Sequence, residues 1–317
     1  MKSFAFVFPG QGSQAVGMLD AWGDHPAVAE TLHEASDALG EDVARLIHEG
    51  PKEALALTTN TQPVMLVASI AAWRAWLAEG GAKPSVVAGH SLGEYSALVA
   101  SEVLTLVQAA PLVRFRAQAM QHAVPVGVGA MAAILGMDAE KVKEGCAEAT
   151  ATFGPGSAEI VEAVNFNDPV QTVIAGSKAA VDKACEILKG NGAKRALLLP
   201  VSAPFHSSLM KPAAEALRER LASISLATPQ IPVVNNIDVS IEVDSDRIRA
   251  ALVRQAAGPV RWVESVQALK NRGVDAIVEC GPGRVLAGMA KRIAPELAAV
   301  SMYDPATLAE TRQLLGG

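Results

Sequence analysis

Short apolar runs that end at Gly or Pro alternate with helix-like segments along much of this chain, and this alternation restricts its fold more than any other feature. Phe4–Phe8 leads into a Pro-Gly turn, and Val86–Ala88 leads into a glycine and a helix-like run to about Ala100. Strands with so few polar residues are typical of parallel sheets buried on both faces. The sequence therefore predicts an α/β fold with a mostly parallel sheet between helices.

The other elements of this large domain are predicted from the same signals. Pro63 suits the first turn of a helix, and Gly281-Pro282-Gly283 should turn the chain into a last long helix. A further helix should begin near His206, with Lys211-Pro212 as an alternative start. We also expect helices over 26–39, 62–79 and 105–122, and strands at 233–234 and 276–279.

The middle of the chain has a different element order. Two predicted strands, 160–165 and 171–175, are joined by a short Asn-Asp-Pro turn rather than by a helix. With the segments around them they give the order β-α-β-β-α-β, the ferredoxin-like pattern. We expect residues 128–200 to form this small domain, inserted into a large domain of residues 1–127 and 201–317. Its other predicted elements are strands at 130–135 and 196–199 and helices at 139–149 and 178–189.

Composition excludes several classes of protein. The formal net charge is −6 and no basic stripe is visible, which argues against nucleic-acid binding. No apolar run is long enough for a membrane span, and the first residues do not fit a signal peptide. Three widely separated cysteines predict neither a disulfide framework nor a zinc site, so a cytoplasmic protein is expected.

The segment Gly89-His90-Ser91-Leu92-Gly93 fits G-x-S-x-G, the pattern of a nucleophile elbow. So tight a turn needs glycine on either side, and it projects the hydroxyl of Ser91 away from the chain. The N–H of Leu92 then points to where an oxyanion would form, beside the positive end of the following helix. The alternative is a strand-to-helix turn whose hydroxyl has no chemical role.

A serine nucleophile needs a general base, and the chain has six histidines. His206 lies where the chain returns from the inserted domain, and catalytic side chains are often placed on such loops. A plain residue at a helix N-terminus is the alternative, and the residues alone do not decide between the two. His90 adjoins Ser91, so its side chain should leave the elbow in another direction and be structural. The remaining four are expected in solvent or at a helix C-terminus: His25, His33, His48 and His122.

The loop Pro9–Gln14 follows the first predicted strand and is rich in glycine. Such a loop can bring the N–H of Gln11 opposite that of Leu92, so that two donors face one oxyanion. The alternative is a plain turn. A phosphate-binding loop is disfavoured because the lysine of G-x-x-x-x-G-K is absent.

Seven motifs, in this order, carry a resemblance to a known family. They are GQGSQ at 10–14, GHSLGEYSAL at 89–98, RAQAMQ at 116–121, NFN at 165–167, APFHS at 203–207, VVNN at 233–236 and ECGPG at 279–283. Together they resemble the malonyl-CoA:acyl-carrier-protein transacylases of fatty-acid synthesis over nearly the whole chain.

The resemblance implies a fold, an activity and partners. The large domain would be α/β-hydrolase-like, with the ferredoxin-like insertion described above. The enzyme would pass malonyl from malonyl-CoA to the phosphopantetheine thiol of acyl carrier protein through a malonyl-serine ester, without a metal or other cofactor. Six basic residues are candidates for docking an acidic carrier: Lys189, Lys194, Arg195, Arg284, Lys291 and Arg292.

The resemblance also implies roles for individual residues. Ser91 would be the nucleophile and His206 its base, with the backbone amides of Gln11 and Leu92 as the oxyanion hole. Gln255 would orient His206 through its backbone carbonyl. Arg116 would bind the malonyl carboxylate, and Asn165 and Asn167 would lie near the site.

The choice of Arg116 has a physical basis as well. A buried guanidinium can grip a carboxylate with two parallel hydrogen bonds, and an acetyl group would leave that cation unpaired. Arg114 is two residues away on a predicted helix, roughly 200° around the axis, so only one of the two can face Ser91. The family pattern often has His-Ala-Phe-His where this chain has Ala203-Pro204-Phe205-His206. Phe205 would narrow the acyl pocket, or else only pack in the core.

Two other functions compete with acyl transfer. A hydrolase can use the same elbow, but its usual order is Ser, acid, His with the histidine near the chain end, whereas a long stretch follows His206 here. A hydrolase also has no need of an arginine in its acyl pocket. A carrier-binding module with an inactive site is the second alternative, and the complete set of site residues disfavours it.

Overall fold

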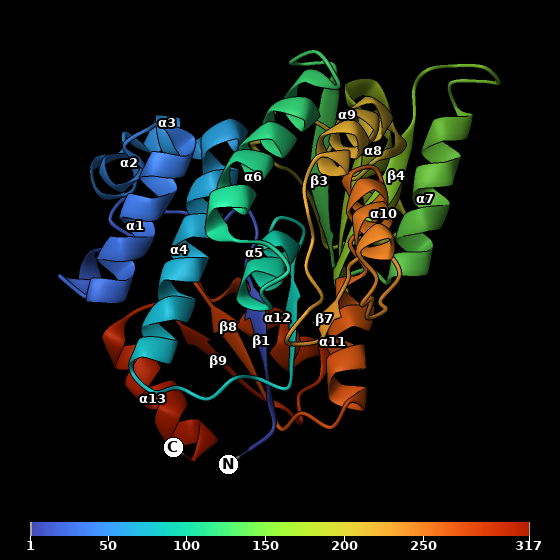
Figure 1. Ribbon diagram of the computed structural model, residues 1–317. Helices are drawn as coiled ribbons and strands as arrows, with labels where there is room; N and C mark the ends of the chain where they lie inside the picture. The colour runs from blue at the N-terminus through green and yellow to red at the C-terminus, as the bar shows by residue number, and fades with distance from the viewer. Residues whose placement is uncertain (1, 317) are drawn as a thin grey trace.

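Five parallel strands form the central sheet of the computed structural model, which describes residues 2–316 (Figure 1). The strand order is β7-β2-β1-β8-β9, and every neighbouring pair is parallel. The chain therefore starts in the middle, adds strands on one side, and then crosses to the other. The bounds are β1 (Phe4–Phe8), β2 (Val86–Gly89), β7 (Val233–Val234), β8 (Ala276–Cys280) and β9 (Ala298–Met302).

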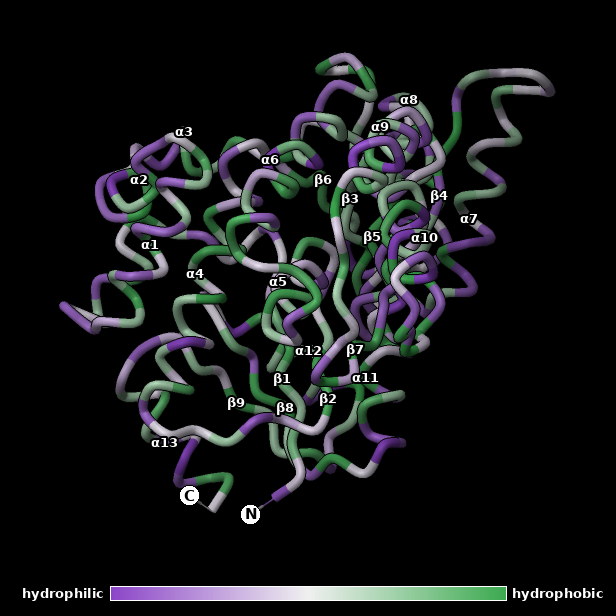
Figure 2. The backbone as a smooth tube through the Cα atoms, in the orientation of Figure 1, coloured by the Kyte–Doolittle hydropathy of each residue, from purple (hydrophilic) through white to green (hydrophobic). Residues whose placement is uncertain are grey.

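Helices cover both faces of this sheet, as the apolar strands predict. Phe4, Phe6 and Phe8 of β1 point to one face, and Ala5 and Val7 point to the other. The strands are among the most hydrophobic segments of the chain (Figure 2). The first face packs on α1 (Pro26–Leu39), α4 (Thr58–Ala78), α5 (Gly93–Ala100), α6 (Leu106–His122), α9 (Lys211–Ala222), α10 (Ser245–Ala256) and α13 (Pro305–Leu315), and the second on α11 (Trp262–Asn271) and α12 (Val285–Ile293).

A second, antiparallel sheet is formed by the middle of the chain, with the order β4-β5-β3-β6. One face packs on its own two helices, and the other packs on the end of α6 and on residues near Phe205. The element order is β-α-β-β-α-β, as predicted. These elements are β3 (Gly129–Leu135), α7 (Ala139–Ala151), β4 (Val161–Asp168), β5 (Gln171–Ser177), α8 (Lys178–Gly190) and β6 (Arg195–Leu198).

Strand β4 fastens the second sheet to the rest of the molecule. The N–H of Val260 donates to the carbonyl of Val164 at 2.8 Å, and the N–H of Phe166 donates to the carbonyl of Val260 at 3.0 Å. At the end of β4, the buried carboxylate of Asp168 pairs with Arg292 of α12 at 2.6 Å. The opposite edge strand, β6, exposes Leu197 and Leu198. The small sheet is thus held along one edge and open along the other.

Three predicted helices differ from those in the structure. Helix α4 begins at Thr58, so Pro63 lies inside it rather than in its first turn. The helix predicted to begin near His206 begins at Lys211 instead, as α9. The first predicted start is therefore wrong, and the alternative start at Lys211-Pro212 is confirmed. The last long helix is also wrong, since α12 has nine residues and is followed by β9 and α13. Also unpredicted are α10, α11 and the short helices α2 (Val43–Glu49) and α3 (Lys52–Ala56).

Within residues 2–316, no helix is both long and apolar enough to cross a membrane.

Gly93 provides a test of how tightly α5 packs on the sheet. A Cβ atom at Gly93 would lie 2.0 Å from the carbonyl oxygen of Phe8 in β1. We expect Gly93→Ala to destabilise the fold by about 3 kcal/mol or more, because backbone rather than a flexible side chain must move. Urea unfolding would measure this. Gly190→Ala is the control, since a Cβ there meets nothing within 4 Å, and equal stability of the two variants would contradict the prediction.

Candidate active site

The turn between β2 and α5 leaves no room for side chains on either side of Ser91. A Cβ at Gly89 would lie 1.9 Å from the backbone of Gly93, and a Cβ at Gly93 would clash with β1. Ser91 itself has φ 52°, in the left-handed region that non-glycine residues rarely adopt. This geometry is that of an elbow, and the turn projects the hydroxyl of Ser91 into a cavity.

Ser91 and His206 meet although 115 residues separate them in the chain. Ser91 Oγ lies 2.7 Å from His206 Nε2, and His206 Nδ1 lies 2.9 Å from the backbone carbonyl oxygen of Gln255. A carbonyl can only accept, so Nδ1 carries the proton of the neutral ring and Nε2 is free to accept the serine proton. His206 also has a left-handed backbone, with φ 66°. The pair has the geometry of a nucleophile and its base.

The backbone amides of Gln11 and Leu92 border the same cavity. Gln11 follows the end of β1 and Leu92 precedes α5, and both residues line the space next to Ser91. Neither N–H donates a hydrogen bond to a group within residues 2–316. Both donors are therefore available to a group that enters the cavity.

Arg116 extends from α6 to the serine and is fully buried. Its Nη1 donates to Gln62 Oε1 at 2.6 Å, and its Nη2 donates to Gln255 Oε1 at 3.0 Å and to Ser91 Oγ at 3.2 Å. These acceptors are neutral, so they orient the guanidinium without cancelling its charge. Arg114 points to the other side of α6, where it pairs with the carboxylate of Glu41.

The cavity at Ser91 has a volume of about 120 Å³. Both sheets contribute to its walls, since β3 and β4 supply one side and the elbow supplies the other. Phe205 and Asn165 line it, whereas Asn167 lies outside it and contacts His90 Nε2 at 2.8 Å. The lining residues are Gln11, Gln62, His90, Ser91, Leu92, Arg116, Met120, Met131, Asn165, Leu199, Val201, Phe205 and His206.

Burial strongly shifts the pKa values of the charged groups here. Burial and then the Arg116 cation lower the pKa of His206 to about 3, against the opposing hydrogen bond to Gln255. Burial raises the pKa of Glu94, which lies beneath the elbow, to about 7. Burial also lowers the pKa of Arg116, with Tyr95 and Glu94 acting in the opposite direction. His206 is therefore neutral at ordinary pH, as a general base must be.

Comparison with known proteins agrees with this geometry. The chain matches the acyl transferase domain family over residues 5–309. It is 50% identical over 315 residues to the malonyl CoA-acyl carrier protein transacylase of Escherichia coli (strain K12), covering 99% of this chain and 100% of that protein. The chain belongs to the malonyl CoA-acyl carrier protein transacylase family.

Solved structures of this transacylase family have the same fold. An acyl-carrier-protein S-malonyltransferase from Burkholderia pseudomallei 1710b is 62% identical, with a TM-score of 0.95 and coverage of 98% of this chain and 99% of that one. A malonyl-transacylase in complex with its type II PKS acyl-carrier protein is 50% identical, with a TM-score of 0.95 and the same coverage. The chain is thus an acyltransferase with a parallel-sheet α/β fold.

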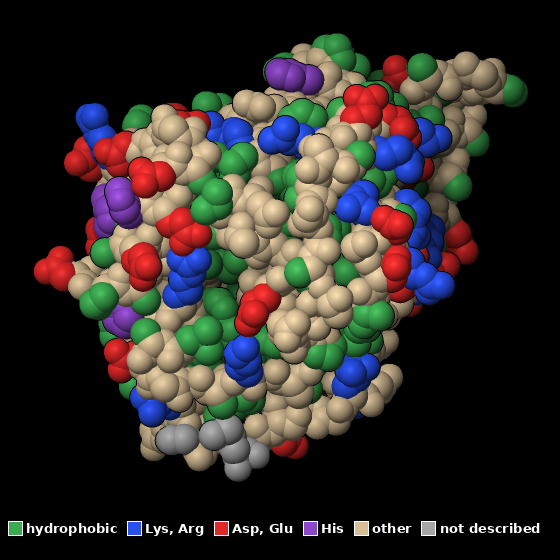
Figure 3. Space-filling model, viewed as in Figure 1, with side chains coloured by type: hydrophobic (Ala, Val, Ile, Leu, Met, Phe, Trp, Pro, Cys, Tyr) green, Lys and Arg blue, Asp and Glu red, His purple; other side chains and the backbone are tan. Residues whose placement is uncertain are grey.

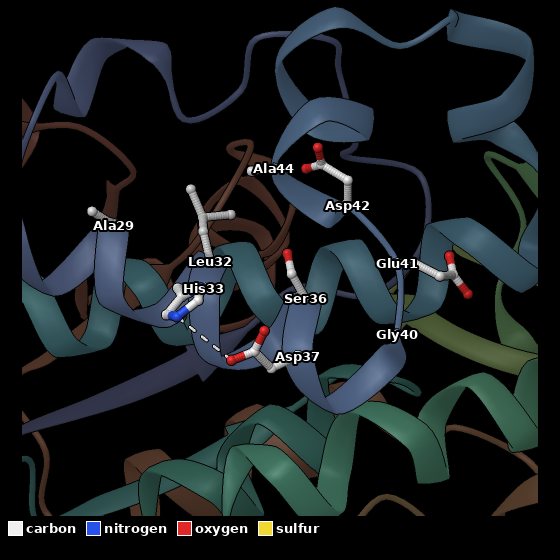
Figure 4. Close-up of a pocket in the computed structure, with 9 residues that line it drawn as sticks. All are labelled: Ala29, Leu32, His33, Ser36, Asp37, Gly40, Glu41, Asp42 and Ala44. Carbon is white, nitrogen blue, oxygen red and sulfur yellow. Dashed lines mark ion pairs between the residues drawn. The ribbon is translucent and has the colours of Figure 1, made fainter.

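A larger hollow lies elsewhere, on α1 and around the start of α2 (Figure 4). Its volume is about 710 Å³, and His33, Ser36 and Asp37 are among its lining residues. They do not form a catalytic group, because Ser36 accepts a hydrogen bond from the N–H of Val43 and His33 pairs with Asp37. In Figure 4 the dashed line joins His33 to Asp37 and does not include Ser36.

Other transacylase site residues could not be predicted from the sequence. Gln62, Glu94 and Asn236 are buried around Ser91 and Arg116. Glu94 and Asn236 lie within the GHSLGE and VVNN motifs, whereas Gln62 lies in no motif. His90 leaves the elbow in another direction, as expected, and contacts Asn167. The expectation of a solvated His25 is wrong, because its ring packs edge-on against Trp22 and only 15% of its side chain is exposed.

The lowered pKa of His206 predicts how stability depends on pH. Between about pH 3 and its ordinary value of 6.5, the unfolded chain binds a proton at this ring that the folded chain does not bind. Acid therefore favours unfolding. We expect the free energy of unfolding of the native protein, relative to His206→Gln, to fall by up to about 1.4 kcal/mol per pH unit below pH 6.5.

Urea unfolding of both proteins at pH 4.5, 5.5, 6.5 and 7.5 measures this difference. The raised pKa of Glu94 acts in the opposite direction, since the folded protein retains that proton, but it is present in both proteins and cancels to first order. A difference that does not change with pH would contradict the prediction.

Proposed function

We propose that this protein transfers the malonyl group from malonyl-CoA to the phosphopantetheine thiol of acyl carrier protein in fatty-acid synthesis. The observation that carries the proposal is one buried cluster in which Ser91 Oγ lies 2.7 Å from His206 Nε2 and 3.2 Å from Arg116 Nη2. A nucleophile, its base and a cation for a substrate carboxylate thus face one cavity. The names of the relatives at 50% identity and above support the same activity.

In the first half-reaction, Ser91 Oγ attacks the thioester carbonyl of malonyl-CoA while His206 Nε2 takes the hydroxyl proton. The tetrahedral oxyanion accepts hydrogen bonds from the N–H groups of Gln11 and Leu92. The C–S bond breaks, His206 returns its proton to the departing CoA sulfur, and a malonyl-serine ester remains. The carbonyl of Gln255 stabilises the imidazolium that forms between these steps, as an acid does in a usual triad.

In the second half-reaction, the carrier's phosphopantetheine thiol gives its proton to His206 and attacks the ester carbonyl. Collapse of the second oxyanion breaks the C–O bond, and His206 protonates Ser91 Oγ. Malonyl leaves on the carrier, and the protein returns to its starting state. Each step uses a group of this chain or of a substrate, so the proposal requires no metal or other cofactor.

Arg116 selects malonyl through its charge. The malonyl carboxylate would pair with a buried cation that otherwise has only neutral acceptors in the described part of the chain. An acetyl group offers no partner, and an unpaired buried charge is costly. The carboxylate would also offset the effect of the Arg116 cation on His206, whose pKa that cation lowers. The correct substrate would thus make its own base stronger.

The two domains and the cellular location are part of the same proposal. We assign residues 1–127 and 201–317 to an α/β-hydrolase-like domain and 128–200 to a ferredoxin-like one, in line with the two sheets. Three cysteines without disulfides support a cytoplasmic location.

The carrier would dock through basic side chains of the protein surface. Of the six candidates, Arg292 already pairs with Asp168, and Arg284 stacks on and donates to Tyr303. Basic and acidic side chains are interspersed over the face in Figure 3, so docking would depend on a local group rather than on the whole surface. Four candidates have neither an ion pair nor a side-chain hydrogen bond among residues 2–316: Lys189, Lys194, Arg195 and Lys291.

Intact-protein mass spectrometry tests the reaction directly. With malonyl-CoA and no carrier, we expect the native protein to gain one malonyl group that maps to Ser91, and Ser91→Ala to gain none. Addition of a phosphopantetheinylated carrier protein should remove the adduct and yield malonyl-carrier. Release of free malonate at the transfer rate without a carrier would favour a hydrolase instead. A native protein that neither gains an adduct nor releases CoA would favour a binding module.

Arg116→Ala tests the source of selectivity, with Arg114→Ala as a matched control on the same helix. We expect the preference for malonyl-CoA over acetyl-CoA, measured as the ratio of kcat/KM values, to fall by about 100-fold or more in Arg116→Ala. Arg114→Ala should keep the ratio of the native protein, because Arg114 pairs with Glu41 away from the cavity. Equal effects of the two substitutions would contradict the assigned role.

A further inference from the structure

Two side chains hold the backbone of Ser91 in its unusual conformation. Asn236 Oδ1 accepts a hydrogen bond from the N–H of Ser91 at 2.7 Å, and Gln255 Nε2 donates to the carbonyl of Ser91 at 2.9 Å. Asn236 Nδ2 also donates to the carbonyl of Gly89 at 2.7 Å, so one amide spans the elbow. A left-handed serine persists only where its surroundings fix it. These side-chain bonds do so together with the backbone N–H of Glu94, which donates to the Ser91 carbonyl at 3.1 Å.

Glu94 holds both Asn236 and Gln255 through one carboxylate oxygen. Its Oε2 accepts the backbone N–H of Asn236 at 2.9 Å and the Nε2 of Gln255 at 3.0 Å. The carboxylate therefore acts with the Ser91 carbonyl to set which way the Gln255 amide faces, because only the NH₂ end can donate to either oxygen. The Oε1 end is then left to accept from Arg116 at 3.0 Å. A flipped amide would set its NH₂ against the guanidinium and leave Glu94 with an oxygen.

We propose that Asn236 and Glu94 are positioning residues for acyl transfer, which brace the Ser91 elbow and set the orientation of the Gln255 side chain. This inference rests on the proposed function. Neither residue lines the cavity, so neither acts on the substrate. Their effect passes through Ser91, whose hydroxyl must stay in line with His206, and through the Gln255 oxygen that holds Arg116.

Asn235 provides a matched control one position away. It is also an asparagine and also buried, but its hydrogen bonds stay in its own loop. Its Nδ2 donates to Ser240 Oγ at 3.0 Å, and its Oδ1 accepts from the N–H of Asp238 at 2.8 Å. Loss of this side chain removes packing and two hydrogen bonds of similar kind, but no bond to the elbow.

Single-turnover acylation separates positioning from folding. Each variant is mixed with malonyl-CoA over a range of concentrations, quenched, and weighed by mass spectrometry. The amplitude of the adduct reports the active fraction, and the rate constant at saturation reports the alignment of Ser91. We expect Asn236→Ala to lower that rate constant by about 100-fold, as misplacements near 1 Å do. The half-saturating malonyl-CoA concentration should stay unchanged, because the cavity and Arg116 remain. Asn235→Ala should acylate at the native rate.

Asn236→Asp carries the test if Asn236→Ala does not fold. Aspartate has the size of asparagine and keeps an oxygen for the N–H of Ser91, but it loses the donor to Gly89. We expect it to acylate at least about tenfold more slowly than the native protein. Wild-type rate constants in folded Asn236 variants, or a lower amplitude with an unchanged rate constant, would overturn the proposal in favour of a purely structural role.

Glu94 is tested by rescue with its conservative variant. Gln at position 94 offers an amide oxygen where Oε2 now accepts both bonds, so Glu94→Gln should keep the native rate constant. Glu94→Leu removes the acceptor and should lower the rate constant by about tenfold or more. Equal rate constants in the two variants would overturn the role of Glu94. A native protein that forms no malonyl adduct would instead refute the proposed function itself.

Discussion

The close approach of the α5 backbone to the ends of β1 and β2 is the constraint on which the rest of this site depends. Without glycine at 89 and 93 the helix could not begin so near the sheet. The tight turn forces Ser91 into the left-handed region and leaves the N–H of Leu92 without a partner in the described chain. Because β1 and β2 are parallel neighbours, the loop that carries Gln11 begins beside the same turn, where Gly10 packs against His90. The strand order reverses at β1, and such a point is where α/β sheets commonly bind ligands.

The second constraint is an uncompensated charge. Arg114 and Arg116 belong to one helix, yet the first has a carboxylate partner and the second has amide and hydroxyl oxygens. A carboxylate paired with Arg116 would stabilise the guanidinium before substrate binds. The site would then no longer favour a charged acyl group. Neutral acceptors keep the guanidinium in place and unsatisfied. Specificity of this kind depends on unfavourable binding of an acetyl group as much as on favourable binding of a malonyl group.

The sequence predicts the architecture well where periodicity and turn residues agree. The first apolar strands, the β-α-β-β-α-β order and the bounds of α1, α6, α7 and α8 to within about two residues follow from local patterns. It fails where local patterns are ambiguous. Residues 298–302 are apolar and alanine-rich, so they fit a helix as well as the edge strand that pairing with β8 makes of them. His206 follows a Pro-Phe step at the end of a loop, and only tertiary contacts hold it at a positive φ, outside any helix.

The site was predictable to the extent that its residues lie in motifs. The elbow and its glycines follow from chemistry, and the meeting of Ser91, His206 and Arg116 required the family resemblance. The buried residues behind the reacting groups, such as Glu94 and Asn236, have almost no local sequence pattern that predicts their role. Glu94 reads as an ordinary helix residue and Asn236 as a turn residue, because the contacts that bury them come from segments more than 100 residues away.

The fastening of the small sheet along β4 has a consequence for how such an enzyme can change. The nucleophile, the base and the arginine all stand on the parallel-sheet part, whereas Met131 and Asn165 of the small sheet and the adjoining Leu199 and Val201 form the facing wall. The residues that react and the residues that shape the acyl-binding cavity thus lie in different segments of the chain. Substitutions in residues 129–201 can reshape the space available to the acyl chain while the reacting groups keep their places, so a lineage could explore new acyl groups without first giving up its chemistry.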